Sequence, residues 1–265
     1  MRAHTAARIA LGRSGGSLPT RAQLEFRLAH AHARDAVLAE FDADALGARL
    51  QALGGRVMVV ESAARDRAEF LQRPDLGRRL AVSSHRALAV SAGRTPRCDL
   101  AIIVSDGLST LAANTQAEPL LAALLPLLRA GGWKLAPLIV ARHGRVALQD
   151  EIGAILGAQI SLMLLGERPG LGNADSLGAY FTYAPTVGRT DADRNCISNI
   201  RPGGLPPPAA ANKLHALLTH AREFGISGVT LKDETGLGDR PDGLSIGGHE
   251  VAAPKLTADD ADRRG

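Results

Sequence analysis

The chain has 265 residues, enough for one domain of ordinary to large size or one domain with a small extra lobe. Apolar residues make up 45% of it and aromatic residues only 3%, so its core must be built from aliphatic side chains. The formal net charge is only +4, without a basic stripe or interleaved aromatics, which argues against a nucleic-acid-binding protein.

The first fifty-five residues have a helical pattern. Thr20 to Gln23 reads as a capping box, with Thr20 as N-cap and Gln23 at N3, and apolar residues follow at helical spacing. A second helix is expected to start at Asp42, to carry leucines on one stripe and to end at Gly54-Gly55. This helical segment either packs on the rest of the chain or reaches toward a partner.

Beyond residue 55 the pattern changes to short apolar runs alternating with helical stretches. Strands are expected at Val57–Val60, Leu100–Val104, Leu135–Ala141, Ile160–Leu165 and Ala179–Tyr183, and helices at Ala64–Ala87, after Gly107, at Gln149–Ala158 and at Asn212–Phe224. The alternation predicts an α/β fold, a Rossmann-like, mainly parallel sheet with helices on both faces, preceded by the helical N-terminal segment. The predicted parts are residues 1–55, an α/β domain at 56–233 and a loosely ordered tail at 234–265.

Cysteine usage and hydropathy indicate the compartment. Cys98 and Cys196 lie far apart and form no CxxC pair, so we expect two reduced thiols. Residues 1–17 lack the apolar core of a secretory signal, and the longest apolar run, Leu120–Leu128, is short and broken by a proline. We therefore expect a cytoplasmic protein that does not act at a membrane.

The common motif families give no chemistry. Gly243–Gly247 formally satisfies G-x-S-x-G but lies in the polar tail, without the strand and helix of a nucleophile elbow. Gly166–Gly172 is G-x-x-x-G-x-G and not the dinucleotide fingerprint, and there is no Walker A sequence.

Two polar groups follow predicted strands, where open α/β sheets bind ligands. Asp106 is either a ligand group or, with Ser105, the cap of the next helix. Glu167 and Arg168 are either a solvated surface pair or groups aimed at a ligand from a loop stiffened by Pro169.

Seven sequence blocks occur in a characteristic order. They are Arg8-Ile-Ala-Leu-Gly-Arg, Ser17-Leu-Pro-Thr, His30-Ala-His-Ala-Arg-Asp-Ala-Val, Arg73-Pro-Asp-Leu-Gly-Arg-Arg-Leu, Asp99-Leu-Ala-Ile-Ile-Val-Ser-Asp-Gly-Leu-Ser, Gly166-Glu-Arg-Pro-Gly-Leu-Gly and Cys196-Ile-Ser-Asn-Ile-Arg-Pro. From about Arg8 to Asp233 the chain thereby resembles the small (light) subunit of ethanolamine ammonia-lyase.

The resemblance implies an adenosylcobalamin-dependent lyase that converts ethanolamine to acetaldehyde and ammonia by radical chemistry. It implies a hetero-oligomer with a large, barrel-shaped subunit that holds most of the substrate pocket. This chain would then clamp the cofactor at the interface, with no catalytic residue of its own and no activity alone.

The resemblance also implies three cofactor-binding residues: Val146, Glu167 and Cys196. A carboxylate such as Glu167 can accept hydrogen bonds from corrin amides or ribose hydroxyls. Val146 would offer apolar contact or its backbone, and Cys196 its backbone or its small size and not a thiolate. The alternatives are that Val146 and Cys196 serve packing alone.

No histidine lies in the D-x-H-x-x-G pattern of proteins that donate a cobalt ligand, so the cofactor is expected to keep its own base on the metal. Only seven residues precede Arg8, where some relatives carry an extension associated with bacterial microcompartments. A free cytoplasmic enzyme is therefore at least as well supported as an encapsulated one. The competing readings are a non-catalytic interaction module and an unrelated stand-alone α/β enzyme.

Overall fold

A computed structural model describes residue 9, residues 11–93 and residues 97–231 of the chain. Contacts between residues define one compact unit, residues 1–233, which contains all of these, and a second unit, residues 234–265. The predicted tail and its G-x-S-x-G sequence therefore lie outside the described residues.

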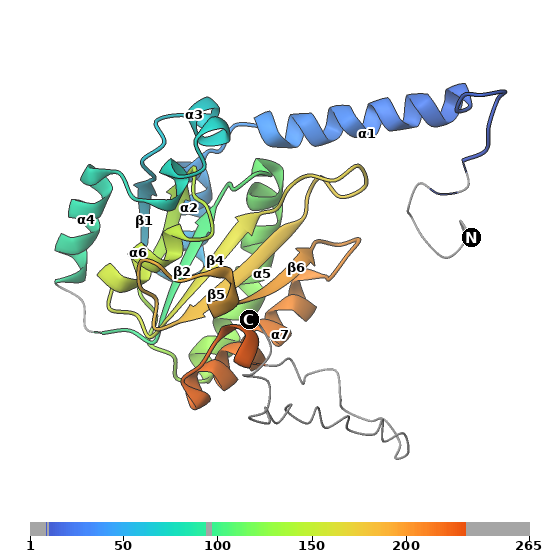
Figure 1. Cartoon of the computed structure of the whole chain (residues 1–265). Coiled ribbons are helices and arrows are strands. Elements are labelled where there is room, and N and C mark those ends of the chain that lie inside the picture. The colour runs from blue at the N-terminus through green and yellow to red at the C-terminus, as the bar shows by residue number, and fades with distance from the viewer. Residues whose placement is uncertain (1–8, 10, 94–96, 232–265) are drawn as a thin grey trace, which may run out of the picture. The chain divides into compact units, whose positions relative to one another are not determined.

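The described part is a mixed α/β structure (Figure 1). Its elements in chain order are α1 (Thr20–Leu38), α2 (Ala43–Ala52), β1 (Val57–Glu61), α3 (Arg67–Gln72), the 3₁₀ turn η2 (Leu76–Arg78), α4 (Val82–Ala92), β2 (Leu100–Ser105), α5 (Thr110–Ala130), β3 (Leu138–Arg142), α6 (Leu148–Ile155), β4 (Ile160–Gly166), β5 (Leu177–Tyr183), η3 (Asp191–Asp193), β6 (Arg194–Ile200), α7 (Pro207–Phe224) and η4 (Gly228–Thr230).

The six strands form one sheet in the order β1-β3-β2-β4-β5-β6. Strands β1 to β4 pair in parallel, as predicted. Strands β5 and β6 are antiparallel additions to the β4 edge, so the sheet is mixed. The sequence reading had no strand at Arg194–Ile200, because that segment is polar and only three of its seven residues are buried.

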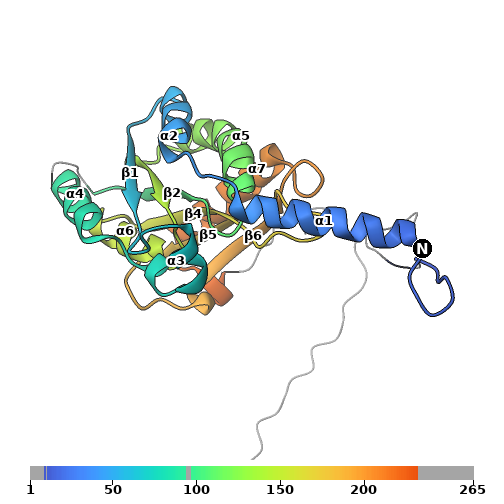
Figure 2. The same ribbon diagram turned by 90° about the horizontal axis from the view of Figure 1, so that it is seen from above.

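Helices cover both faces of the sheet, as expected. Alternate side chains of a strand point to opposite faces, so Ile102 belongs to the core cluster that contains Leu121 of α5 and Leu214 of α7. The neighbouring Ile103 packs with α6, for example through Ile152. Figure 2 shows α2 and α5 on one side of the strands and α6 on the other.

Local capping confirms one helix start and corrects two. Asp42 caps α2, its carboxylate accepting the N–H of Ala45, as predicted. The capping box at Thr20 is wrong, because Pro19 is the N-cap of α1 and Thr20 is already helical. The cap proposed at Ser105 or Asp106 is also wrong, since α5 starts later and Ser109 accepts the N–H of Ala112.

The long predicted helix at 64–87 is three shorter elements: α3, η2 and α4. Arg73-Pro74 ends the first, because a residue before proline is disfavoured in helical conformation. After α7 the chain forms the 3₁₀ turn η4 at Gly228–Thr230. In α1 only Ala22 and Ala36 are buried, and several apolar side chains, including Leu24 and Leu28, are exposed.

Candidate functional site

The parallel strands β2, β3 and β4 end at the same edge of the sheet. The helix that follows β2 packs on one face and the helix that follows β3 on the other. Chain segments that leave adjacent strands in opposite directions open a crevice at the carboxyl ends, the usual ligand position in open α/β sheets. The segments at this edge are Asp106–Leu108, His143–Val146 and Gly166–Arg168.

Asp106 is completely buried at this edge and organises it. Its Oδ1 accepts the backbone N–H of His143 at 2.7 Å and the Ser105 hydroxyl at 3.0 Å. Ser105 Oγ in turn accepts the N–H of Gly144 at 2.9 Å. The segment after β3 is therefore held by the segment after β2, and burial raises the pKa of Asp106 while Arg67 opposes that rise.

Arg67 from α3 completes the arrangement. Its Nη1 donates to Asp106 Oδ2 at 2.7 Å and to the carbonyl of Gly107 at 2.6 Å. Its other nitrogens reach the carbonyls of Leu108 and Val37. One guanidinium thus joins the end of α1, the start of α3 and the segment after β2.

Glycine is required where the segments after β2 and β4 meet. A Cβ on Gly166 would lie 2.0 Å from the carbonyl oxygen of Ser109 and 2.4 Å from that of Asp106. Gly107 has φ +54° and would place a Cβ 2.3 Å from the oxygen of Gly166. This close backbone approach fixes the position of Glu167, the next residue.

A hollow of about 520 Å³ opens beside this contact. It is lined by Gly107, Leu108, Arg145, Val146, Leu165, Gly166, Glu167, Arg168, Asn173, Tyr180 and Ser198. Two of the three predicted site residues, Val146 and Glu167, are therefore brought together from segments after different strands. Apolar side chains, an aromatic ring, hydroxyls and charged groups all line it.

Glu167 is held in place by β6 and by the residue that precedes β5. Its carboxylate accepts hydrogen bonds from the Ser176 hydroxyl, from Ser198 Oγ at 2.5 Å and from the backbone N–H of Asn199 at 3.1 Å. An ionised carboxylate has about four acceptor positions. Three are occupied, so Glu167 is fixed and keeps one position, on Oε1, for a ligand.

Val146 is half-buried against the core beneath α6. Its carbonyl accepts the N–H of Gln149 at 3.2 Å, in the first turn of α6. Within the described residues its own N–H has no acceptor. Val146 thus lines the hollow with a backbone N–H that is not engaged within the described residues.

Cys196 lies in the middle of β6, opposite Tyr180 of β5. Its position in a strand and its exposure correct the alternative in which it is a buried packing residue. The surrounding strands desolvate its thiol and, with the negative charge of Glu167, raise the pKa of Cys196 to about 11, although a hydrogen bond with Tyr180 opposes this. Cys196 is thus a neutral thiol beside Tyr180, a residue that lines the hollow.

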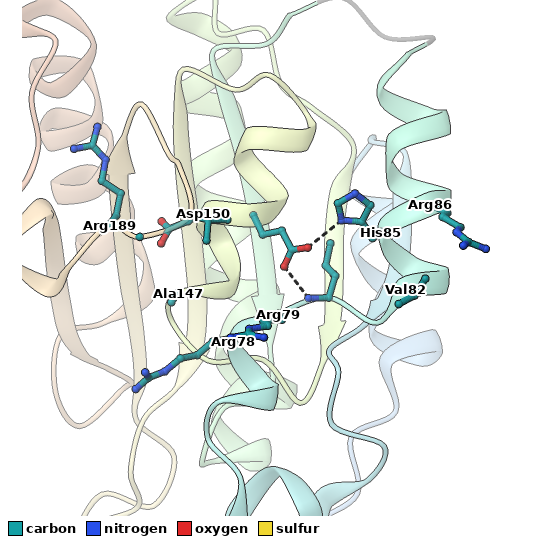
Figure 3. A pocket seen from close by; sticks show the side chains of 12 residues that line it. Arg78, Arg79, Val82, His85, Arg86, Ala147, Asp150 and Arg189 are labelled. Atoms are coloured by element: carbon teal, nitrogen blue, oxygen red, sulfur yellow. Dashed lines mark hydrogen bonds and ion pairs between the residues drawn. The ribbon is translucent and has the colours of Figure 1, made fainter.

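A second hollow, of about 630 Å³, lies between the start of α4, α6 and the connection from β5 to β6 (Figure 3). Its acidic groups are satisfied internally: Glu151 accepts the N–H of Leu80 and contacts His85, and Asp150 pairs with Arg194. In Figure 3 the guanidinium groups of Arg86 and Arg189 point in opposite directions. Its polar groups do not converge on a common point, which makes it the weaker candidate.

Several functional groups had no signal in the sequence. Arg67 lies 39 residues from Asp106, and only the folded chain brings them together. Arg145 could have been suspected from its place in the segment that follows the predicted strand ending at Ala141, and Ser198 from its position in the Cys196 block. In the part of the chain that the structure describes, no group of three His, Cys, Asp or Glu side chains could hold a metal ion. Among the described helices, none has the length and apolarity needed to cross a lipid bilayer.

Comparison with known proteins gives one consistent result. Residues 1–232 match the family model of the ethanolamine ammonia-lyase light chain (EutC). The chain is 54% identical over 234 residues to an ethanolamine ammonia-lyase small subunit of Ralstonia nicotianae, which covers 88% of this chain and 87% of the relative. It is 53% identical over 248 residues to the Azotobacter vinelandii protein of the same name, covering 93% and 92%. A Pseudomonas putida relative shares 54% identity over 231 residues, or 87% and 85% of the two chains.

Proposed function

Because the chain belongs to the ethanolamine ammonia-lyase light chain family, we propose that it is the cofactor-clamping subunit of an ethanolamine ammonia-lyase. It acts together with a large subunit and adenosylcobalamin, in a complex whose substrate is ethanolamine. The observation that carries the proposal is the meeting of Val146 and Glu167 in one hollow at the carboxyl ends of the parallel strands, with Cys196 on the strand beside it.

The groups in the hollow suit the edge of a corrinoid. The amide side chains of a corrin ring donate and accept hydrogen bonds, and the nucleotide tail offers ribose hydroxyls. The open acceptor position of Glu167 suits an amide or hydroxyl donor, and the free N–H of Val146 suits a carbonyl. Leu108 and Leu165 provide apolar contact and exclude water.

When bound, adenosylcobalamin supplies the radical chemistry of the deamination. The residues of this chain hold the cofactor in a fixed orientation against the large subunit and shield that contact from water. None of them is assigned a catalytic role. This assignment agrees with the raised pKa of the Cys196 thiol and with the three hydrogen bonds that the Glu167 carboxylate already accepts.

The test is reconstitution of the full chain with the large subunit and adenosylcobalamin. Ammonia should be released from ethanolamine only when all three are mixed. Glu167→Ala should weaken cofactor affinity about tenfold, the size of one lost charge-assisted hydrogen bond. Glu223→Ala, which removes an exposed carboxylate at the end of α7, is the matched control and should leave the affinity unchanged.

Two results would contradict the proposal. If the large subunit turned over ethanolamine at full rate without this chain, the chain would not be needed to hold the cofactor, and a non-catalytic interaction module would be favoured. Release of ammonia by this chain alone would favour a stand-alone enzyme. An unchanged affinity in Glu167→Ala would remove that residue from the site.

A further inference from the structure

Arg145 carries a positive charge that no acidic side chain of the described residues pairs with. It lines the hollow that holds Val146 and Glu167. Asp106, the nearby carboxylate, is already paired with Arg67 at 2.7 Å. The other charges that act on Arg145 are those of Arg67 and Arg78, and both repel it.

The side chain is nevertheless fixed. The Arg145 backbone N–H donates to the carbonyl of Gly77 at 2.8 Å, and its guanidinium lies 4.2 Å from the centre of the Phe70 ring. Its Nη2 donates to the Phe70 carbonyl at 3.3 Å, and its Nε is buried without a partner, whereas Nη1 is not buried and has no hydrogen-bond acceptor within the described ranges. A cation held on an aromatic face with donors unused is organised to receive an anion.

The environment agrees with this geometry. Burial, followed by the repulsion of Arg67 and Arg78, lowers the pKa of Arg145, although a guanidinium remains charged at any physiological pH. Keeping this charge in a half-buried position costs free energy when the chain is alone. An anionic ligand would remove that cost, and attraction across a partly desolvated site is stronger than in water.

We propose that Arg145 binds the phosphodiester group of the cobalamin nucleotide loop. The inference rests on the proposed function, because it takes the cofactor as the occupant of the hollow. The corrin side chains are neutral amides, whereas the phosphodiester is a charged group on the part of the cofactor that extends from the ring. Arginine presents several donors in a plane and is well suited to phosphate oxygens.

The experiment compares three corrinoids in the reconstituted complex, with affinity measured by spectrophotometric titration. Adenosylcobalamin carries the phosphodiester and base, adenosylcobinamide carries neither, and adenosylcobinamide phosphate carries a phosphate without the base. Arg145→Gln should bind adenosylcobalamin about tenfold to a hundredfold more weakly than the unmodified complex, the usual range for a charged hydrogen bond. It should bind adenosylcobinamide as well as the unmodified complex does, and lose affinity for adenosylcobinamide phosphate.

Two further variants separate binding from structure. Arg145→Lys keeps the charge and should retain part of the preference for corrinoids that contain phosphate. Arg86→Gln removes an exposed arginine of α4 and is the matched control for the loss of one positive charge. It should bind all three corrinoids normally.

The outcomes also separate a failure of the proposed role of Arg145 from a failure of the proposed cofactor-binding function. Equal losses for adenosylcobalamin and adenosylcobinamide in Arg145→Gln would show a purely structural role and overturn the inference. A loss confined to adenosylcobalamin, absent with adenosylcobinamide phosphate, would assign recognition to the base and also overturn it. If the unmodified complex bound none of the corrinoids, the proposed function itself would fail.

Discussion

Two ion pairs of arginine with a buried aspartate lie beside this sheet, and they differ in what surrounds them. Arg194 and Asp150 are both almost fully buried and share two hydrogen bonds of 2.7 Å between the start of β6 and α6. Arg67 and Asp106 share one contact of 2.7 Å, and most of their remaining bonds go to backbone groups of the segments after β2 and β3, with others to the Val37 carbonyl of α1 and the Ser105 hydroxyl.

The first pair is a closed unit. The other bonds of Arg194 go to the Thr182 hydroxyl and the carbonyl of Arg189, both near the same end of the β5–β6 pair. The second pair reaches outward, to the segments that line the hollow beside Val146. Burial of a charged pair therefore does not by itself identify a ligand site, since the Arg194–Asp150 pair is more deeply buried but lies away from the hollow. The Arg67–Asp106 pair lies at the candidate site because it fixes the backbone segments at the edge of the sheet.

The largest predicted effect tests the closed pair. Arg194→Met leaves the Asp150 carboxylate buried without its partner, which should lower the free energy of unfolding by about 3–5 kcal/mol. Denaturant unfolding of the full chain measures this. In the reconstituted complex, molecules that remain folded should bind the cofactor with normal affinity, because the pair touches none of the residues that line the hollow.

A second variant controls for the size of the side chain. Asp150→Leu combined with Arg194→Met removes both charges and should be much less destabilised than the single variant. A loss of less than about 1 kcal/mol in Arg194→Met would show that the pair does not stabilise the sheet.

The second prediction concerns the outward-facing pair. Asp106→Asn keeps the shape but leaves the Arg67 charge without its partner and weakens the bond to the His143 N–H, so the free energy of unfolding should fall by about 2–3 kcal/mol. Unlike Arg194→Met, it should also weaken cofactor affinity about tenfold, because the segment that carries Val146 loses its anchor. Calorimetric unfolding and cofactor titration of the same preparation measure both quantities.

An unchanged cofactor affinity in Asp106→Asn would erase the distinction between the two pairs. Asp75→Asn is the matched control, since Asp75 is an exposed partner of Arg73 near the same part of the chain. It should change neither quantity by a measurable amount.

The two pairs also mark what the sequence could and could not predict. The parallel strands were predicted because each contains a continuous apolar run, and β2 at Leu100–Val104 is buried on both faces. The edge strand β6 was missed because its polar residues bind across the sheet and to Glu167 and do not fill a core. A polar strand of this kind has the composition of a loop.

The N-cap of α5 and the contacts of Asp106 could not be predicted from the sequence for a different reason. Asp106 and Ser109 are both good N-caps, and which one caps α5 depends on the tertiary partners that claim Asp106. Arg67, Asp106 and His143 meet only when the chain is folded. The resemblance to a family named Val146, Glu167 and Cys196, but it could not show that Glu167 spends most of its acceptor capacity on β5 and β6.

The smallest predicted effect concerns the reactivity of a single thiol, that of Cys196. With its pKa raised to about 11, Cys196 should react with iodoacetamide at pH 8 about two orders of magnitude more slowly than an ordinary exposed thiol. The rate should rise about tenfold per pH unit up to about pH 10, because only the thiolate reacts. Mass spectrometry of the Cys196 peptide from the reconstituted complex measures it, with the buried Cys98 as an internal comparison.

A rate that levels off near pH 8.5 would mean that the thiol is not desolvated and that β6 does not pack as described. Cys196→Ser should change cofactor affinity by less than about twofold, since a hydroxyl of similar size keeps the hydrogen bond with Tyr180. The larger Cys196→Leu should weaken binding more, because it would crowd Tyr180 at the hollow. Cys196 is thus expected to affect cofactor binding through the size and shape of its side chain. The two ion pairs differ from it, because the effects of their variants arise when one charge of a pair loses its partner.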